Sequence, residues 1–556
     1  MAPDALAVGA FLVLALSPAG WVGFALLCGA LATAWLGGRP EPLATSLPAR
    51  ILLAAGVLAH AAPGAARWPL AATGAVLLGS LAAERVLRTA ARPQFRVAHL
   101  PPLPDRSPVL SGNQAVWLAN AGLILISGLL AALRWPVWPV LVPAAGAAAL
   151  TGGLLVAAVA RWRNRHRAAL AALRSAVERH DPRFLLYFSA PPGSGYQATM
   201  WLPHLERIGE PFLVVLPETD HLPEISAATR APVIAYRSFA ALDALMVPGL
   251  RAAFYVNNGM KNAHCVRYVG LTHVQLYHGD SDKAVTSSPV TAMFDRIFVA
   301  GQAGIDRFAA NGVHIPPEKF RIVGRPQVAD LEVAAGHIGD VTDQVVLYAP
   351  TWASAYADAN HCSLPIAETI VRGLLDHGVT VILRPHPYTS RDPRSRSRLR
   401  RVEQLLAADR ERSGRAHRWG AAAATRSTLY DCMNAAHAMV CDISSVASDF
   451  LYTGKPLALT DMTGAGAAVT GSFPIARGTY LLRPDAGNLA EVVDDLLRSD
   501  PLAGTRREVR VHYLGDAPPD RYVETFLAEA RTVVGTSEDS AAPESSRNPA
   551  MRASSA

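Results

Sequence analysis

The chain has 556 residues, of which 51% are hydrophobic and 17% are charged, and its formal net charge is +7. This length exceeds that of one compact domain, and the five cysteines, scattered without a CxxC spacing, exclude a disulfide framework. Arginine carries almost all of the positive charge, which suits an anionic lipid or an anionic substrate. The chain lacks the interleaved aromatic and basic residues of nucleic-acid binders, so we expect no nucleic-acid partner.

Residues 1–162 are predicted to form a transmembrane helical region, because they are rich in Ala, Leu, Val and Gly and apolar stretches of about spanning length recur in them. About five to six spans are expected. Arginine-rich loops and the run RWRNRHR that follows the last stretch indicate the cytoplasmic side. We therefore expect a multi-pass cell-membrane protein whose catalytic half lies on the cytoplasmic face. The apolar stretches are roughly 5–37, 50–66, 69–84, 115–133 and 136–160.

The remainder of the chain alternates short apolar runs with helical stretches, which is typical of parallel α/β sheets. RFLLYFSA, PFLVVL, APVIAY, AAFYV, HVQLYH and RIFVAG are expected strands of one sheet, and VVLYAPTW, VTVILRPHP and AMVCDISS of a second. The predicted fold is a GT-B-like pair of Rossmann-type domains, preceded by the multi-span membrane region. The domains are predicted at 163–335 (acceptor side) and 336–535 (nucleotide donor side), and 536–556 is expected to be a disordered tail.

The stretch VQLYHGDSDKAV places His278 and Gly279 directly after a predicted strand. A histidine can act as a general base near neutral pH, and Gly279 allows a sharp turn and the close approach of a ligand. Asp280 could orient His278 or an acceptor hydroxyl, and Lys283 could bind a phosphate. The alternative is an ordinary loop histidine. Asp280 and Asp282 also have the spacing of a cation site, but no metal site is predicted.

The stretch LRPHP ends another predicted strand. Arg384 offers a forked donor that suits a phosphate, and the two prolines that flank His386 restrict its backbone, which would hold its side chain in place. The alternative is a rigid strand exit without a catalytic role.

The stretch CDISSVASDFLYTGKP predicts a strand that ends at Asp442 and a short helix that begins after it. Ser444 and Ser445 are good residues for a helix start, where free backbone N–H groups attract anions, and Lys455 follows the helix. Asp442, Ser444, Ser445 and Lys455 are expected to bind the substrate or its phosphates. The alternative is a helix that is only well capped.

Three further positions follow predicted strands or lie in the expected interdomain linker. Thr351 in LYAPTW could hydrogen-bond a phosphate or a ribose. Asn258 of YVNNGMKN and Arg325 of GRPQ are also expected to bind the substrate or its phosphates. Three of the four lysines in the chain lie in the stretches described above, which suggests sites that need a compact ammonium group, although four are too few to exclude chance.

Taken in order, HGDSDK, YAPTW, RPHP and DISSVASDFLYTGKP resemble the CDP-glycerol glycerophosphotransferase family, the teichoic-acid primases and polymerases. The resemblance implies that an acceptor hydroxyl attacks the β-phosphorus of CDP-glycerol or a related CDP-polyol and that CMP leaves. It implies His278 as the base, His386 and Arg384 as groups that stabilise charge on the diphosphate, and Ser444 and Ser445 as phosphate ligands. No cofactor is required, because Arg, Lys, His and helix dipoles can supply the positive charge.

The expected partners are a nucleotide-activated donor and a lipid-linked acceptor of the polyprenyl-diphosphate type at the membrane. Two alternatives stay open: a GT-B glycosyltransferase that uses a nucleotide sugar for cell-envelope polysaccharide, and a non-catalytic membrane scaffold that binds nucleotide or polymer. A transporter is disfavoured, because the apolar stretches lack paired polar groups. The sequence does not indicate the polyol, the acceptor, primase or polymerase action, or the oligomeric state.

Overall fold

The computed structural model describes residues 2–36, 47–62, 67–91, 94–101, 103, 110–136, 138–353 and 360–535. The predicted disordered tail, 536–556, lies outside the described residues, as do parts of the loops used above to assign the cytoplasmic side. The chain divides into two compact units. The first comprises Met1–Phe95, Pro101–Ala176 and Arg237–Leu245, and the second comprises Arg96–Leu100, Val177–Tyr236 and Met246–Ala556.

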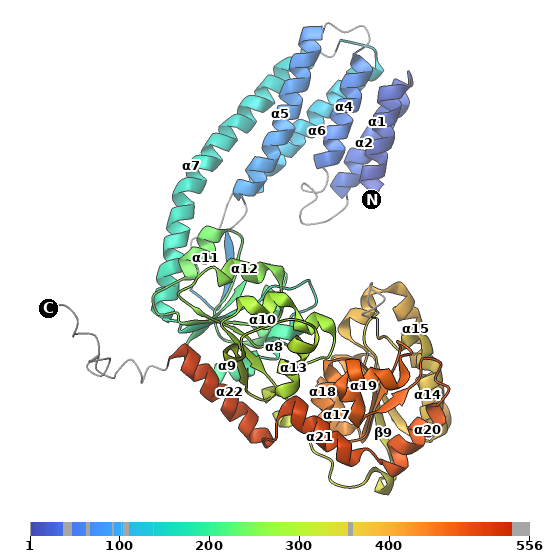
Figure 1. Cartoon of the computed structure of the whole chain (residues 1–556). Coiled ribbons are helices and arrows are strands. Elements are labelled where there is room, and N and C mark those ends of the chain that lie inside the picture. The colour runs from blue at the N-terminus through green and yellow to red at the C-terminus, as the bar shows by residue number, and fades with distance from the viewer. Residues whose placement is uncertain are drawn as a thin grey trace, which may run out of the picture. The chain divides into compact units, whose positions relative to one another are not determined.

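The first unit is built mainly from helices that lie side by side (Figure 1). Alanine and leucine, the strongest helix formers among apolar residues, dominate their sequences. Leucines such as Leu14, Leu53 and Leu81 fill the space between the helices, and the Ser80 hydroxyl donates a 2.7 Å hydrogen bond to Asn120 Oδ1. The helices are α1 (Ala2–Leu16), α2 (Gly20–Leu36), α4 (Leu47–Ala61), α5 (Arg67–Ala91), α6 (Leu110–Ala132) and α7 (Leu141–His180), the last of which continues into the second unit.

The membrane prediction is contradicted in this unit. Among the residues that the structure describes, no helix combines the length and the apolar character that crossing a membrane requires. Helices α1, α2 and α4 have 15, 17 and 15 residues, which at a rise of 1.5 Å per residue gives about 22 to 26 Å against a hydrocarbon core of about 30 Å. The multi-span membrane part of the predicted fold and the multi-pass membrane location are therefore wrong. For the stretch 5–37, the reasoning from hydropathy overlooked the break that separates α1 from α2.

The second unit contains two sheets, both rich in Val, Leu, Ile, Phe and Tyr, which favour strands. The first has eight strands in the order β1-β4-β3-β2-β5-β6-β7-β8, and the pairs from β4 to β8 are parallel. Most strand residues are buried, as expected for parallel strands covered on both faces. The strands are β1 (Phe95–Ala98), β2 (Phe184–Tyr187), β3 (Phe212–Leu216), β4 (Val233–Tyr236), β5 (Ala252–Tyr255), β6 (Thr272–Gln275), β7 (Arg296–Val299) and β8 (Phe320–Ile322).

The second sheet has five parallel strands in the order β10-β9-β11-β12-β13. In the register, Cys441 of β11 lies opposite Ala349 of β9, so the two strands end at the same edge. The segments that follow them are thereby brought together. The strands are β9 (Val345–Ala349), β10 (Thr380–Leu383), β11 (Ala438–Asp442), β12 (Leu457–Thr460) and β13 (Tyr480–Leu482).

Helices and 3-10 turns connect the strands of the second unit and cover the sheets (Figure 1). The α-helices are α8 (Tyr196–Thr199), α9 (Leu202–Glu206), α10 (Leu222–Ala228), α12 (Ala263–Val266), α13 (Gln302–Ala310), α14 (Ala367–Asp376), α15 (Pro393–Ser413), α16 (Ala421–Ala424), α17 (Leu429–Ala435), α18 (Ser445–Leu451), α19 (Val469–Ser472), α20 (Leu489–Asp494), α21 (Ala503–Leu514) and α22 (Pro519–Val534); α11 (Phe239–Leu245) falls in the first unit.

Two features differ from the expected domain layout. The predicted boundary at residue 162 falls inside α7, which runs unbroken to His180. The last helix, α22, packs its apolar side, including Phe526 and Ala530, into the core of the first sheet, although the chain reaches α22 only after completing the second sheet. This return of the chain ties the two halves of the second unit together.

Candidate active site

A cleft of about 850 Å³ lies in the second unit. Segments that follow β5 and β6 of the first sheet and β9, β10 and β11 of the second line it, so the carboxyl ends of both sheets face one space, where α/β folds bind ligands. Its volume lies within the usual range for small-molecule sites. The lining residues used below are Tyr196, Asn258, His278, Gly279, Lys283, Arg325, Thr351, Trp352, Arg384, His386, Ser444, Ser445 and Asp449.

The loop that carries His278 makes its turn at Tyr277 and not at Gly279. Strand β6 ends at Gln275, and Tyr277 adopts a left-handed conformation with a φ of 55°. A side chain at Gly279 is excluded for another reason: a Cβ there would lie 2.6 Å from the Ser445 Oγ. Gly279 is therefore required by the close approach of α18.

His278 is held in one tautomer by its backbone contact. Its Nδ1 lies 2.8 Å from the carbonyl oxygen of Val256, and a carbonyl can only accept a hydrogen bond, so Nδ1 carries the proton. In the neutral ring Nε2 then has a free lone pair. Burial lowers the pKa of His278 to about 4; the bond to Val256 opposes this shift and the charge of Arg325 adds to it. The ring is neutral at pH 7 and can accept a proton at Nε2.

His386 is held in the opposite tautomer. The backbone N–H of Tyr388 donates to its Nδ1 at 3.1 Å, so in the neutral ring Nε2 carries the proton. The pKa of His386 is lowered to about 4, mainly by burial and in addition by the charges of Lys283 and Arg391. The cleft thus contains one neutral histidine that accepts at Nε2 and one that donates at Nε2.

Tyr196 links the two histidines and was not singled out in the sequence. Its ring centroid lies 6.2 Å from that of His278 and 6.3 Å from that of His386, edge to face with each. The Trp352 ring lies 6.4 Å from His386 and 5.6 Å from Tyr388, so aromatic groups surround His386. The signal that could have revealed Tyr196 is its place after the glycine-rich turn PPGSG that follows β2.

Lys283 and Thr351 lie together on the cleft wall. The Lys283 Nζ is 3.4 Å from the Thr351 Oγ1, and burial lowers the pKa of Lys283. Asp442 does not line the cleft. Its carboxylate accepts hydrogen bonds from the Thr351 N–H at 2.6 Å, the Ser363 N–H at 3.1 Å and the Thr460 hydroxyl at 2.6 Å. Asp442, expected to bind substrate, instead fixes the loop that presents Thr351.

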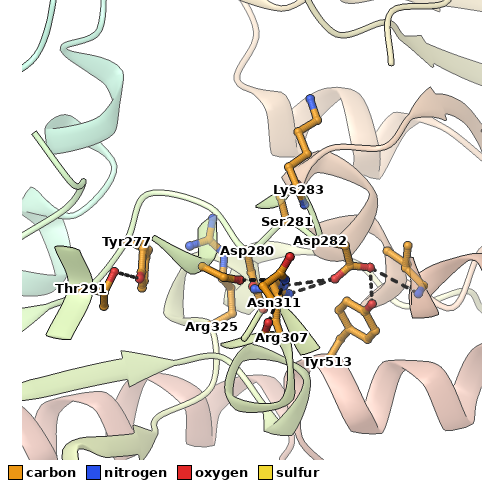
Figure 2. A network of polar contacts seen from close by, with 12 residues as sticks. Tyr277, Asp280, Ser281, Asp282, Lys283, Thr291, Arg307, Asn311, Arg325 and Tyr513 are labelled. Carbon is orange, nitrogen blue, oxygen red and sulfur yellow. Dashed lines mark hydrogen bonds and ion pairs between the residues drawn. The ribbon is translucent and has the colours of Figure 1, made fainter. Parts of the chain in front are cut away.

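Asp280 belongs to a buried charge cluster (Figure 2), and within the described part of the chain it forms no hydrogen bond with His278. Arg307 pairs with Asp280, and its Nη2 lies 3.1 Å from Asp282 Oδ1. The Tyr513 hydroxyl also donates to Asp282. Lys283 points away from this cluster in the figure. The role expected for Asp280 as the partner of His278 is therefore not supported.

The same cluster bears on the cation-site spacing of Asp280 and Asp282, because Arg307 occupies both carboxylates. Among the residues that the structure describes, no group of three or more His, Cys, Asp or Glu side chains could hold a metal ion.

Arg325 forms a buried, two-pronged ion pair with Asp449 of α18. Its Nε and Nη2 donate to the two carboxylate oxygens at 2.7 and 3.1 Å, and Nη2 also lies 3.4 Å from the carbonyl oxygen of His278. The Tyr430 hydroxyl donates to Asp449 at 3.1 Å. Arg325 was expected to bind phosphate; the pair with Asp449 engages most of its donors and joins the His278 loop to α18.

Three other predicted phosphate ligands also have protein partners. The Arg384 Nη1 donates to backbone carbonyls, among them that of Ser427 at 2.8 Å. The Lys455 Nζ lies outside the cleft and donates to the carbonyls of Met433 and Asn434 at 3.0 and 3.1 Å, at the end of α17. Asn258 lines the cleft but accepts a 2.9 Å hydrogen bond from Gln275.

Ser444 and Ser445 stand at the start of α18 and line the cleft. Ser444 has an extended backbone and its hydroxyl makes no capping bond to α18. Both hydroxyls are therefore placed where a ligand in the cleft could meet them.

Comparison with known proteins identifies one family. Residues 327–461 match the family model described as CDP-Glycerol:Poly(glycerophosphate) glycerophosphotransferase, which confirms the resemblance drawn from the motifs. The comparison with curated proteins yielded no match.

Solved structures give distant matches. The wall teichoic acid polymerase TagF is 12% identical, with a TM-score of 0.38 over 68% of this chain and 95% of that one. A glycosyltransferase from Rickettsia africae ESF-5 is 10% identical, with a TM-score of 0.39 over 64% of this chain and 99% of that one. A UDP-N-acetylglucosamine 2-epimerase is 12% identical, with a TM-score of 0.41 over 63% of this chain and 96% of that one. At such scores these matches carry no argument about function.

Proposed function

We propose that this chain is a CDP-glycerol glycerophosphotransferase-like enzyme, which transfers glycerol phosphate from CDP-glycerol, or a related polyol phosphate from its CDP-polyol, to the hydroxyl of a teichoic-acid-type acceptor; the match of residues 327–461 supports the proposal. CMP is the other product. The acceptor in this proposal is a lipid-linked cell-wall polymer or its precursor.

In the proposed step His278 is the general base. Its Nε2 takes the proton of the acceptor hydroxyl as that oxygen bonds to the β-phosphorus of the donor. The bond from this phosphorus to the bridging oxygen breaks, and that oxygen leaves with CMP. Atoms and charge balance without a further reactant.

His386 and Lys283 stabilise the charge that develops in this step. The Nε2–H of His386 donates to a phosphate oxygen, and the ammonium of Lys283 supplies a positive charge next to Thr351. The hydroxyls of Ser444 and Ser445 add neutral donors. The anionic donor would raise the pKa of both histidines above their values in the free enzyme, bringing His278 nearer to the range in which a base is most effective.

One observation supports the proposal most strongly: two neutral histidines line one cleft from different sheets, one fixed as an acceptor and the other as a donor. Such a pair suits base-catalysed phosphoryl transfer, since the nucleophile must lose a proton while the phosphate gains stabilising contacts.

The test offers the purified full chain radiolabelled CDP-glycerol, CDP-ribitol and a panel of nucleotide sugars, with glycerophosphate oligomers or lipid extract as acceptors. We expect CMP release and label transfer from one CDP-polyol, and a loss of about 100-fold or more in kcat for His278→Ala. His377→Ala, a change at an exposed histidine on the edge of α14, is the matched control. Transfer only from a nucleotide sugar would establish the glycosyltransferase alternative instead.

A further inference from the structure

Two consecutive residues of α21, His512 and Tyr513, lie against the part of the chain that builds the first sheet. The His512 Nε2 is 2.8 Å from Asp306 Oδ2 on α13, and this pair is partly exposed. A Cβ at Gly301, which precedes α13, would lie 2.6 Å from the Tyr513 backbone, so the two helices approach closely there. The chain reaches α21 only after it completes the second sheet, so this contact joins the segments of the two sheets.

The side chain of Tyr513 extends inward to Asp282, whose carboxylate has partners on both oxygens (Figure 2). The Tyr513 hydroxyl donates to Oδ2, and the N–H of Ile475 lies 3.5 Å from the same oxygen. Arg307 donates to Oδ1 through Nη2 at 3.1 Å. Burial raises the pKa of Tyr513, so the hydroxyl keeps its proton and can donate. Segments of both sheets therefore hold this one carboxylate.

Asp282 is followed directly by Lys283, which lines the cleft. Residues 280–283 lie in neither a helix nor a strand, so their placement depends on side-chain contacts such as those of Asp282. The backbone of Lys283 is extended, with a φ of −63° and a ψ of 137°, and neighbouring side chains of an extended segment point to opposite sides. Figure 2 shows Lys283 pointing away from the cluster that holds Asp282. A shift of Asp282 would therefore move the Lys283 ammonium, which lies 3.4 Å from the Thr351 Oγ1.

We propose that Tyr513 is a positioning residue, whose hydroxyl anchors Asp282 and thereby holds the Lys283 ammonium where it meets the diphosphate of the donor. The inference rests on the proposed function, which places that diphosphate next to Lys283. In the part of the chain that the structure describes, the cleft lining includes Lys283 but neither Asp282 nor Tyr513. The contact of Lys283 with a phosphate thus depends on the packing of α21 against α13.

The experiment is a double-mutant cycle on the binding of CDP to the purified full chain, measured by isothermal titration calorimetry, so it does not depend on turnover. Tyr513→Phe removes only the hydroxyl and should weaken CDP binding about tenfold. Lys283→Ala should weaken it at least as much. Adding Tyr513→Phe to Lys283→Ala should have no further effect, because the hydroxyl acts through the ammonium group.

The matched control is Tyr480→Phe, which removes the same kind of bond outside the cleft. The Tyr480 hydroxyl donates to Asp500 Oδ1 at 2.8 Å, and the Arg506 Nη1 donates to the same oxygen at 2.8 Å. This variant should bind CDP like the wild type. The proposal is overturned by equal weakening in Tyr480→Phe, by unchanged binding in Tyr513→Phe, or by effects of Tyr513→Phe and Lys283→Ala that add in the double variant.

A second variant covers the case in which Tyr513→Phe does not fold. Asp282→Asn keeps an oxygen that can accept from Tyr513 but removes the charge that pairs with Arg307. It should also weaken CDP binding, and this effect should also disappear in the Lys283→Ala background. A loss that persists in that background would show that the cluster does not act through Lys283.

Kinetics separate this inference from the proposed function. With CDP-glycerol as donor, Tyr513→Phe should raise the KM for the donor about tenfold and leave the KM for the acceptor unchanged, whereas a smaller folded fraction would lower kcat and change neither KM. If the wild type binds CDP but releases no CMP from any CDP-polyol, the proposed function fails, and the cycle still decides whether Tyr513 acts through Lys283. Without CDP binding by the wild type the inference fails, whatever the CMP assay gives.

Discussion

Replacing Asp449 by asparagine should loosen the structure around the site, because it leaves a buried charge without its partner. Arg325 and Asp449 have side chains that are only 6% and 4% exposed, and two hydrogen bonds of 2.7 and 3.1 Å join them. Asparagine keeps the shape but removes the negative charge. Breaking a buried ion pair in this way costs about 3 to 5 kcal/mol.

The assay is hydrogen exchange of the backbone amides of α18. Exchange there follows the local opening of α18, so it reports on the Arg325–Asp449 pair even if the whole chain does not unfold in one step. A cost of about 3 to 5 kcal/mol corresponds to exchange roughly 200 to 5,000 times faster. Asp449→Asn should also raise the KM for CDP-glycerol, because α18 carries Ser444 and Ser445 into the cleft.

The double variant Arg325→Gln/Asp449→Asn is the internal control. It removes both charges, so it should cost less than the sum of the two single changes. Exchange in Asp449→Asn within about fivefold of the wild type, a change of about 1 kcal/mol, would refute the reasoning that this pair holds the two halves of the site together.

Three further predictions concern the cleft. Gly279→Ala should reduce kcat/KM, because the new Cβ would lie 2.6 Å from the Ser445 Oγ, and adding Ser445→Gly should restore part of the loss if the clash is the cause. Burial lowers the pKa of His278 to about 4, and only the neutral ring can act as a base. The value of kcat/KM should therefore stay constant from neutral pH downward and decrease only as the pH falls through about 4; a decrease centred near pH 6.5 would contradict this. Tyr196→Ala should lower kcat/KM by about tenfold by removing the ring between His278 and His386, whereas Tyr196→Phe should stay within about threefold; equal losses would assign the effect to the hydroxyl.

Much of the second unit could be predicted from the sequence. Short runs such as FLLY, FLVVL and AMVCD are apolar on both faces and recur with helical segments between them, so they indicate parallel strands. His278 and His386 each follow such a strand, but the strands belong to different sheets, so their meeting in one cleft also requires the carboxyl ends of the two sheets to face each other.

The partners of the charged residues could not be predicted in the same way. Arg325 and Asp449 are 124 positions apart, and Asp282 and Tyr513 are 231 apart. No local pattern connects such pairs, so Arg325 and Asp280 looked like free ligands. The sequence also does not show that the lysine at 455 meets the carbonyl groups at the end of α17.

The first unit shows where composition misleads. Its Ala- and Leu-rich stretches satisfy a hydropathy criterion, but hydropathy does not reveal where each helix begins and ends. The stretch 5–37 divides into α1 and α2 around Pro18, and 50–66 is covered in part by the 15-residue α4. Tyr196 was missed for a related reason: a tyrosine after a glycine-rich turn resembles many packing residues.

The most direct test of the central claim is the release of CMP from radiolabelled CDP-glycerol by the full chain and by its His278→Ala and His386→Ala variants, with a glycerophosphate acceptor. The account predicts transfer by the wild type, a loss of at least about 100-fold in each variant, and no change in His377→Ala. Undiminished CMP release in His278→Ala would contradict it.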